Sequence, residues 1–182
     1  GRTALITGAA SGIGRGIALV LAREGVDVAV TDIDPDGAQS VADEVAGIGC
    51  GSMVVGLDVT SRDSARSGTE RVLEKFGKID ILVNNAGVVG APGWWDRRIP
   101  SDDDWAAVMD INLMGVVYVS QAVESHMKHR LYGKIVNIAS IAARQGGPGI
   151  PHYNASKAAV VSWTQSHALR MAAYNVNVNA VC

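Results

Sequence analysis

The sequence predicts an α/β fold: a doubly wound, Rossmann-type parallel sheet between two layers of helices, built as one domain over residues 1–182. Short runs rich in β-branched residues alternate with longer segments of helical pattern, which is typical of parallel strands joined by right-handed crossovers. The runs are apolar at successive positions, as in strands that are covered on both faces. A length of 182 residues suffices for one substantial core and is short for two ordinary domains.

The expected elements alternate along most of the chain. Six runs predict strands, at Thr3–Thr7, Asp27–Thr31, Ser52–Leu57, Ile79–Asn84, Gly133–Ser140 and Asn175–Val181. Six segments predict helices, at Ile13–Glu24, Pro35–Ala46, Arg62–Phe76, Asp102–Ile111, Met114–His129 and Tyr153–Tyr174. Asp34 and Pro35 predict a helix start, because a carboxylate suits the N-cap and proline suits the first helical position. Glycine and proline in Val88–Pro100 predict a surface loop.

Composition excludes several classes of partner. A formal net charge of −2 gives no reason to expect nucleic acid or an anionic membrane surface. No run of about 18 apolar residues and no signal peptide is present, so we expect no membrane span and a cytoplasmic protein. Cys50 and Cys182 have neither metal-ligand spacing nor a disulfide pattern, and we expect no metal. The chain lacks an initiator Met and stops at Cys182 inside a strand, so we expect an excerpt of a longer protein.

A glycine-rich turn follows the first strand. Between Gly8 and Gly14, glycine lets the backbone turn sharply and approach a pyrophosphate without a Cβ clash. The helix that opens there offers unpaired N–H groups and a positive dipole end to phosphates. The spacing Gly-x-x-x-Gly-x-Gly differs from the usual dinucleotide fingerprint, so a plain tight turn is the alternative.

Polar residues follow the next strands at the edge where open α/β sheets bind ligands. Asp32 ends the second strand, where a carboxylate accepts hydrogen bonds from an adenosine ribose and repels the 2′-phosphate of NADP. No Arg or Lys lies within the glycine turn or directly after Asp32, which favours NAD; the alternative is that Asp32 only caps the turn before Asp34. Asp58-Val59 and Asn84-Asn85-Ala86-Gly87 follow the third and fourth strands, and each motif alone is more often a structural turn.

Tyr153 and Lys157 are four residues apart, so they share one face of the expected helix. A free phenol has a pKa of about 10, and an ammonium nearby favours the phenolate. Lowering that pKa by roughly three units takes about 4 kcal/mol, more than one solvated charge pair supplies. The pair therefore needs a cofactor charge or a partly dry site to act near neutrality.

Taken together, these residues resemble the short-chain dehydrogenase/reductase family. The turn Thr7-Gly8-x-x-x-Gly12-Ile13-Gly14, the Asn84-Asn85-Ala86-Gly87 motif and Tyr153-x-x-x-Lys157 occur in that family's order and separation. Ser140, thirteen residues before Tyr153, and Asn112 match further family positions. The resemblance covers essentially all 182 residues and implies an enzyme that acts on CH–OH groups with NAD or NADP as acceptor.

The resemblance also implies a role for each residue. Tyr153 would be the acid or base at the substrate oxygen and Ser140 would orient that oxygen. Lys157 would lower the Tyr153 pKa and hold the nicotinamide ribose. Asn112 would anchor a water that relays protons to Lys157. The positive nicotinamide ring of the oxidised cofactor would further favour the Tyr153 phenolate. The implied cofactor contacts at the phosphates are Gly8, Gly12, Ile13 and Gly14. Asp32 would contact the adenosine ribose, and Asp58 and Val59 the adenine. The remaining implied cofactor contacts are Asn85, Ala86 and Gly87, through the backbone, and Tyr153 and Lys157. Asn84 is expected to tie strands together.

One departure concerns the end of the chain. In the family, a Pro-Gly segment after the sixth strand supplies nicotinamide contacts, a substrate lid and a final strand, and this chain stops at Cys182 before it. We expect that the lid and strand belong to the parent protein; the alternative is a fragment with weak nucleotide binding and little turnover. Three further features are given no role in the chemistry: His152 is expected to be a bystander, Trp94 and Trp95 border the substrate mouth or cover apolar surface, and Asp102–Asp104 favour a helix start.

The function expected from all this is NAD-dependent interconversion of a small-molecule secondary alcohol and a ketone, by a homo-oligomer that is a tetramer or a dimer. One alternative is an NADPH-dependent 3-oxoacyl thioester reductase, which Asp32 and the absence of basic residues disfavour. The other is a non-catalytic nucleotide-binding regulator, which an intact Ser140, Tyr153 and Lys157 disfavour.

Overall fold

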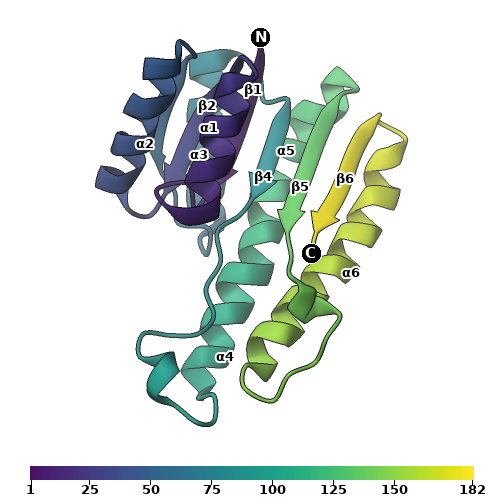
Figure 1. Ribbon diagram of the computed structural model, residues 1–182. Helices are drawn as coiled ribbons and strands as arrows, with labels where there is room; N and C mark the ends of the chain where they lie inside the picture. Colours follow the sequence, from purple (N-terminus) through teal and green to yellow (C-terminus); the bar gives the residue numbers. More distant parts are fainter.

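The computed structural model describes residues 1–182 and places all six predicted strands in one parallel sheet (Figure 1). The strand order is β3-β2-β1-β4-β5-β6, so the chain builds outward from β1 and then resumes from β4 in the opposite direction. Such a switch leaves a crevice at the carboxyl ends of the two central strands. The strands are β1 Arg2–Thr7, β2 Val26–Asp32, β3 Ser52–Gly56, β4 Ile81–Asn84, β5 Gly133–Ile138 and β6 Val176–Val181.

Helices lie on both faces of the sheet, which confirms the predicted α/β/α layers. On one face, α1 and α2 pack on the first strands through an apolar cluster that includes Ala18, Val41 and Val28. On the other, α3, α5 and α6 share a second cluster that includes Val123 and Met171. In Figure 1, β4, β5 and β6 have no helix on the side turned to the viewer. The helices are α1 Gly12–Arg23, α2 Pro35–Ile48, α3 Arg62–Phe76, α5 Gly115–Arg130 and α6 Pro151–Ala172.

Local capping agrees with the sequence. The Asp34 carboxylate accepts a hydrogen bond from the Gly37 N–H at 3.1 Å, and Pro35 occupies the first position of α2. Pro151 does the same for α6, which therefore begins two residues ahead of the predicted start at Tyr153. The predicted loop Val88–Pro100 contains one short 3-10 turn, Trp94–Asp96.

The helix that carries Asn112 departs from the prediction. The sequence predicts a break between Ile111 and Met114, whereas helical backbone continues from α4 (Asp102–Val108) through a π-helical turn at Met109–Met114 into α5. The predicted break is wrong because a helix can admit one extra residue as a wide turn without ending. Such turns are found mostly at functional sites, and Asn112 is the buried residue within this one.

The continuous run Asp102–Arg130 is long and apolar enough, by length and composition alone, to cross a membrane. Within this protein it covers one face of the sheet. Val108, Val119 and Val123 are fully buried there, and this packing accounts for its apolar character.

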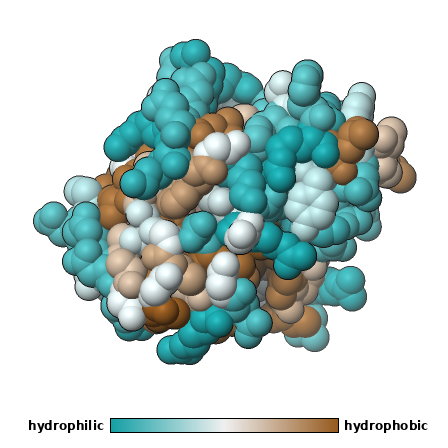
Figure 2. Space-filling view, turned by 90° about the horizontal axis from the view of Figure 1, so that it is seen from above, coloured by the Kyte–Doolittle hydropathy of each residue, from teal (hydrophilic) through white to brown (hydrophobic).

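A buried carboxylate joins elements at the amino-terminal edge of the sheet. Asp80, which precedes β4, accepts hydrogen bonds from the Thr3 N–H at 2.9 Å and from the Arg130 guanidinium at 2.8 Å. Lys78 lies 3.8 Å from the same carboxylate. Figure 2 views this end of the molecule, which is largely hydrophilic with smaller apolar areas. Burial by itself would raise the pKa of Asp80, but the bonds from Arg130 and Thr3 and the nearby charges lower it overall.

We therefore predict that Asp80→Ala lowers the free energy of unfolding by about 2–3 kcal/mol at pH 7, measured by urea denaturation, because Arg130 and Thr3 lose their acceptor. Asp43→Ala, at an exposed helical carboxylate, is the control and should change stability by less than about 0.5 kcal/mol. A carboxyl with a lowered folded pKa stabilises above its unfolded pKa and loses that effect as pH falls through the folded value. The difference between wild type and Asp80→Ala should therefore shrink in strong acid, and a constant difference would contradict the assignment.

Candidate active site

The carboxyl ends of the strands surround a cavity of about 1320 Å³, larger than the usual pocket for one small ligand. Along the edge from β3 to β5, its walls carry Asp58, Asp32, Gly12, Gly87 and Ser140 in turn. The cavity also extends over the open face of β4 and β5 beside α1. Of the predicted site residues, all line this cavity except Gly14 and Asn112. The topological switch therefore brings together residues that lie far apart in the sequence.

The glycine turn has the geometry of a phosphate cradle. Gly8 and Gly12 adopt φ angles of 62° and 54°, which favour glycine. A Cβ at Gly14 would lie 2.2 Å from the Gly8 carbonyl oxygen, so Gly14 allows the turn to close, whereas a Cβ at Gly12 would meet nothing within 4 Å. Gly12 thus presents bare backbone to the cavity.

The start of α1 is free to receive an anion. Ser11, its N-cap, makes no side-chain hydrogen bond to the helix, and no acidic residue lies in the first turn. The N–H groups of that turn therefore remain available, and they carry the positive end of the helix dipole. With the open backbone at Gly12, this arrangement fits the phosphates of NAD or NADP.

Asn85 joins the two turns that flank the switch point. Its side-chain amide donates to the carbonyl oxygens of Thr7 at 3.0 Å and Gly8 at 2.9 Å. In return, the Thr7 hydroxyl accepts from the backbone N–H groups of Asn85 and Ala86 at 3.0 and 3.1 Å. A Cβ at Gly8 would lie 2.7 Å from the Ala86 Cα, so the two turns are in direct contact. The sequence indicated a cofactor contact at Asn85 and did not reveal this bridging role.

Asp32 combines the two interpretations that the sequence left open. One oxygen accepts from the Asp34 N–H at 3.1 Å, which is the turn-capping role, and the other accepts from the Ala10 N–H at 2.9 Å. Each carboxylate oxygen can accept a second bond, and the side chain faces the cavity. Asp32 thus holds the glycine turn in place and still presents negative charge to the cavity.

Asp58 follows β3 and is held in a similar way. One of its oxygens accepts from the Thr60 N–H at 2.9 Å and from the Thr60 hydroxyl at 2.7 Å. Its second oxygen has no partner within the protein, and the residue lines the cavity. Asp58 therefore caps the turn with one carboxylate oxygen and keeps the other free to accept a hydrogen bond.

Tyr153 and Lys157 lie on one face of α6 and both line the cavity, with the Lys157 ammonium 5.7 Å from the centre of the Tyr153 ring. The Lys157 Nζ donates to the Ile138 carbonyl oxygen at 2.7 Å, which ties α6 to the end of β5. Lys157 is only 4 % exposed. Burial lowers its pKa to about 8, so the group remains mostly protonated at neutral pH. This is the partly dry site that the pair requires.

Ser140 follows β5 and begins a 3-10 turn at Ile141–Ala143. Its hydroxyl oxygen accepts from the Ala142 N–H at 3.1 Å, which fixes the side chain. The hydroxyl proton remains available for donation to a ligand in the cavity. Ser140, Tyr153 and Lys157 therefore present three polar groups to the same space from two elements.

Asn112 lies outside the cavity wall and is fully buried. Its amide donates to the Val88 carbonyl oxygen at 2.8 Å and to the Ser156 hydroxyl at 3.0 Å, and it accepts from the Val88 N–H at 2.8 Å. The Ser156 hydroxyl in turn donates to the Tyr153 carbonyl oxygen at 2.8 Å. The side chain thus fixes α6 to the loop after β4, and the water relay implied by the resemblance stays a prediction.

Asn84 ties strands together, as expected. Its amide donates to Asn137 of β5 at 2.8 Å and to Ser120 of α5 at 3.0 Å. Asn137 then donates to Thr164 of α6 at 2.9 Å. This buried chain of bonds fixes the helix that carries the Tyr-Lys pair relative to the sheet.

His152, next to Tyr153, points away from the cavity. It is 2 % exposed and its ring lies 6.0 Å from that of Trp105 in α4. Neither ring nitrogen has a hydrogen-bond partner. The expectation that His152 takes no part in the chemistry agrees with this placement.

Sequence patterns did not identify several groups that build the site. Val88 and Ile138 act through backbone atoms bonded to Asn112 and Lys157, and no side-chain motif signals such a role. Ile33 and Thr60 line the cavity because they directly follow Asp32 and the Asp58-Val59 pair. Their position after a strand end is the only signal by which they could have been found.

The sequence profile of the short chain dehydrogenase family matches residues 2–182. The chain is 40 % identical to the 3-oxoacyl-(acyl-carrier-protein) reductase FabG of Thermotoga maritima, over 100 % of this chain and 72 % of that protein. It is 42 % identical to the oxidoreductase UcpA of Escherichia coli K12, over 100 % of this chain and 68 % of that protein. The crystal structure of an NAD+-bound xylitol dehydrogenase is similar, with a TM-score of 0.93 and 38 % identity, over 98 % of this chain and 68 % of that one. With its fold and its cavity, this protein belongs to the short-chain dehydrogenase family and is an oxidoreductase that acts on CH–OH groups with NAD or NADP as acceptor.

Proposed function

We propose that residues 1–182 act as one NAD-dependent catalytic unit that interconverts a secondary alcohol and a ketone. The observation that carries this proposal is the placement of Ser140, Tyr153 and Lys157 in one cavity beside the glycine turn. The turn at the start of α1 would hold the phosphates of the cofactor, and the strand order places β4 and β5, which Ser140 follows, beyond β1. When bound, the nicotinamide supplies the hydride donor or acceptor.

Tyr153 moves the proton in this scheme. In the direction of oxidation, its phenolate oxygen accepts the proton of the substrate hydroxyl, and in reduction the phenol returns it. Ser140 donates its free hydroxyl proton to the same substrate oxygen and holds it in place. Because Ser140 is itself fixed by the Ala142 N–H, this donor is oriented before substrate arrives.

Lys157 supplies a positive charge beside Tyr153. Its ammonium lies in a site that is almost closed to water, where a charge acts more strongly than it does in solution. Only one of its three N–H groups is used, by the Ile138 carbonyl, so the others can reach ribose hydroxyls. Asn112 contributes by holding Ser156 and the loop after β4, and we propose that it also anchors the proton-relay water.

We propose NAD rather than NADP as the cofactor because of the charged side chains in the cavity wall. Asp32 and Asp58 are the carboxylates in the cavity wall, and Lys157, at the other end, is its only cation. A 2′-phosphate beside Asp32 would meet negative charge with no basic group to neutralise it. The same reasoning disfavours an NADPH-dependent 3-oxoacyl thioester reductase, although one relative carries such a name. A non-catalytic regulator would have no need of a buried lysine beside a tyrosine.

We further propose a homo-oligomer in which α5 and α6 pack against a second copy. Leu169, on the outer surface of α6, is 82 % exposed, and a large aliphatic side chain in that position suits a contact between subunits.

Replacing Asp32 separates its two roles. Asp32→Asn keeps an acceptor for the Ala10 N–H and removes the charge, so we expect the ratio of NADPH to NADH affinity to rise by at least about tenfold. Asp32→Ala should do the same and also weaken both cofactors, because the glycine turn loses its tie. Fluorescence titration with each reduced cofactor measures the ratio. Asp43→Asn, at an exposed carboxylate of α2 outside the cavity, is the control. An unchanged ratio in Asp32→Asn would remove Asp32 from cofactor discrimination.

Tyr153→Phe removes the proton carrier and leaves the cavity shape almost intact. Turnover should fall by about 10²–10⁴-fold, while the affinity for NADH stays within about twofold. Turnover is followed by NADH absorbance with a panel of polyols, hydroxy acids and apolar secondary alcohols and their ketones. Turnover close to that of wild type would exclude Tyr153 as the acid-base group.

Lys157→Met tests the burial of the ammonium. A pKa lowered from 10.5 to about 8 corresponds to about 3 kcal/mol by which burial disfavours the charged form. Lys157→Met removes this cost but also loses the hydrogen bond to Ile138, which offsets part of the gain. We therefore expect Lys157→Met to be more stable than wild type by about 1–2 kcal/mol at pH 7 and to lose turnover. Lys75→Met, at an exposed position, should change neither stability nor turnover appreciably.

The same lysine predicts a pH dependence. Between about pH 8 and 10.5 the unfolded chain holds a proton that the folded protein has released, so the stability of wild type should rise across that window. The advantage of Lys157→Met should correspondingly decrease there. Chemical denaturation at a series of pH values measures both curves, and parallel curves would show that the lysine is not buried as a cation.

A further inference from the structure

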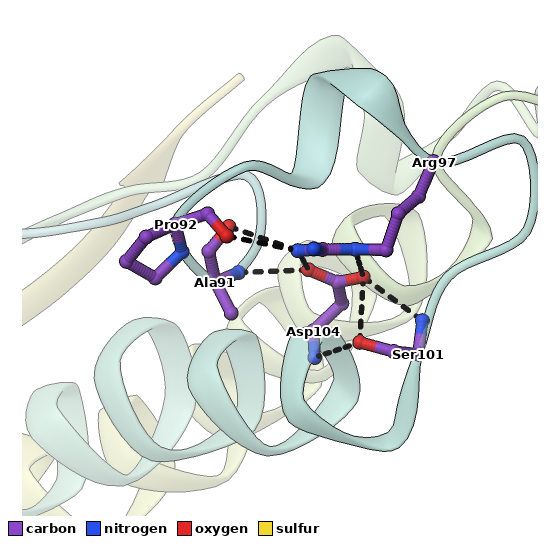
Figure 3. Close-up of polar contacts among 5 residues, drawn as sticks. All are labelled: Ala91, Pro92, Arg97, Ser101 and Asp104. Atoms are coloured by element: carbon purple, nitrogen blue, oxygen red, sulfur yellow. Dashed lines mark hydrogen bonds and ion pairs between the residues drawn. The ribbon is translucent and has the colours of Figure 1, made fainter.

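The loop between β4 and α4 is held by a buried carboxylate (Figure 3). Asp104, 1 % exposed, accepts from the Ala91 N–H at 2.9 Å, from the Ser101 N–H at 2.9 Å and from the Ser101 hydroxyl at 3.0 Å. Arg97 donates to both oxygens of the same carboxylate, at 2.8 and 2.7 Å. Five donors thus converge on one side chain. We refer to Arg97, Ser101 and Asp104 as the clasp.

The clasp fixes the course of the loop as well as its end. The Arg97 guanidinium also donates to the carbonyl oxygens of Ala91 and Pro92, both at 3.2 Å. It therefore joins the first part of the loop to the Asp104 carboxylate. A Cβ at Gly90 would lie 2.8 Å from an Asp104 oxygen and 2.6 Å from the Trp94 Cβ. The backbone therefore passes directly against the clasp two residues after it leaves Val88.

The other end of the loop is held by Asn112, which bonds both backbone groups of Val88. Asn112 and Asp104 belong to one continuous helical run, so the loop is fixed at two points on the same rigid element. Val88, at the first anchor, and Val89, which follows it toward the clasp, line the cavity on the side of β4. Their position in the cavity wall is thus set by Asn112 on one side and by the clasp on the other.

This part of the wall is apolar. Val88 and Val89 after β4, and Ala139 and Ile141 on either side of Ser140, line the cavity and have apolar side chains. The two carboxylates of the wall follow β2 and β3, at the other half of the sheet edge. Lys157, the only cation, is engaged by Ile138. A substrate at Tyr153 therefore finds hydroxyl groups for one oxygen and hydrocarbon beside it.

We propose that Val88 and Val89 form a wall that selects secondary alcohols and ketones carrying an alkyl or aryl group, and that the clasp positions this wall. The proposal rests on the proposed function and specifies its substrate class. Arg97 is a positioning residue here: it acts on the substrate through the loop and has no contact with the reacting atoms. Polyols and hydroxy acids are disfavoured, since they would place hydroxyl or carboxylate groups against hydrocarbon.

Contact with the wall can be measured as kcat/KM for a homologous series of 2-alkanones, from 2-butanone to 2-octanone. Complete burial of one methylene strengthens binding by up to about fourfold, so kcat/KM of wild type with NADH should rise with each added carbon. Arg97→Gln loosens the wall and should reduce the increment to less than about half of its wild-type value, mainly through KM. NADH affinity and kcat for 2-butanone should stay within about twofold, because the cofactor cradle and Tyr153 are untouched.

Matched variants separate positioning from general damage. Arg98→Gln changes the neighbouring exposed arginine, which makes no bond within the protein, and should keep the wild-type increment. Arg97→Lys retains the charge without the two-pronged contact and should give an intermediate increment. Thermal unfolding and NADH titration establish that each variant is folded and binds cofactor.

The outcomes are distinct. The proposal is supported if wild type turns over alkanones, if Arg97→Gln reduces the rise in kcat/KM per added carbon, and if Arg98→Gln retains that rise. Preference for xylitol or 3-hydroxybutyrate over 2-octanol, or no dependence on chain length, overturns the substrate class. An unchanged increment in Arg97→Gln overturns the role of the clasp. If wild type binds NADH and turns over no substrate of any class, the proposed function itself fails.

Discussion

The site depends on the contact between the two turns that follow β1 and β4. Gly8 lies so close to Ala86 that a single methyl group would force them apart, and the amide of Asn85 and the hydroxyl of Thr7 bond across the gap. This contact closes the base of the crevice at the topological switch. The glycine turn lies on one side of this contact and the loop to Val88 on the other, so the contact fixes these two parts of the site relative to each other.

Polar side chains that do not line the cavity hold α6, the helix that carries Tyr153 and Lys157. Asn84, Asn137 and Thr164 link the sheet to α6, and Asn112 links α6 to the loop after β4. The Asn84 and Asn137 amides donate along this chain, while the Asn84 side-chain oxygen is buried without a partner. The directions of these bonds make the chain specific to one arrangement. It positions Lys157 in a site where burial lowers the pKa of the ammonium, an arrangement that opposes stability and favours chemistry.

The same helical run serves both halves of the site. Its π-helical turn carries Asn112 and its first turn carries Asp104, so one rigid element anchors the loop after β4 at two points. The Arg97 guanidinium holds the pKa of Asp104 well below its usual range, so this anchor stays charged at neutral pH. Loops of this kind set specificity in α/β enzymes because the scaffold beneath them does not change.

The sequence alone determined the alternation of strands and helices, the α/β/α layers and most of the candidate site residues, of which all but Gly14 and Asn112 line the cavity. These features are encoded locally, in β-branched runs, in capping residues such as Asp34 and in the glycine spacing of the first turn. Tertiary structure decided how those residues are held. The second role of Asp32 toward Ala10 and the bond from Lys157 to Ile138 join positions that are distant in the chain. The bonds from Asn112 to Val88 and Ser156 do the same. Such bonds use backbone atoms or common side chains, and only packing brings them into reach, so no local pattern could reveal them.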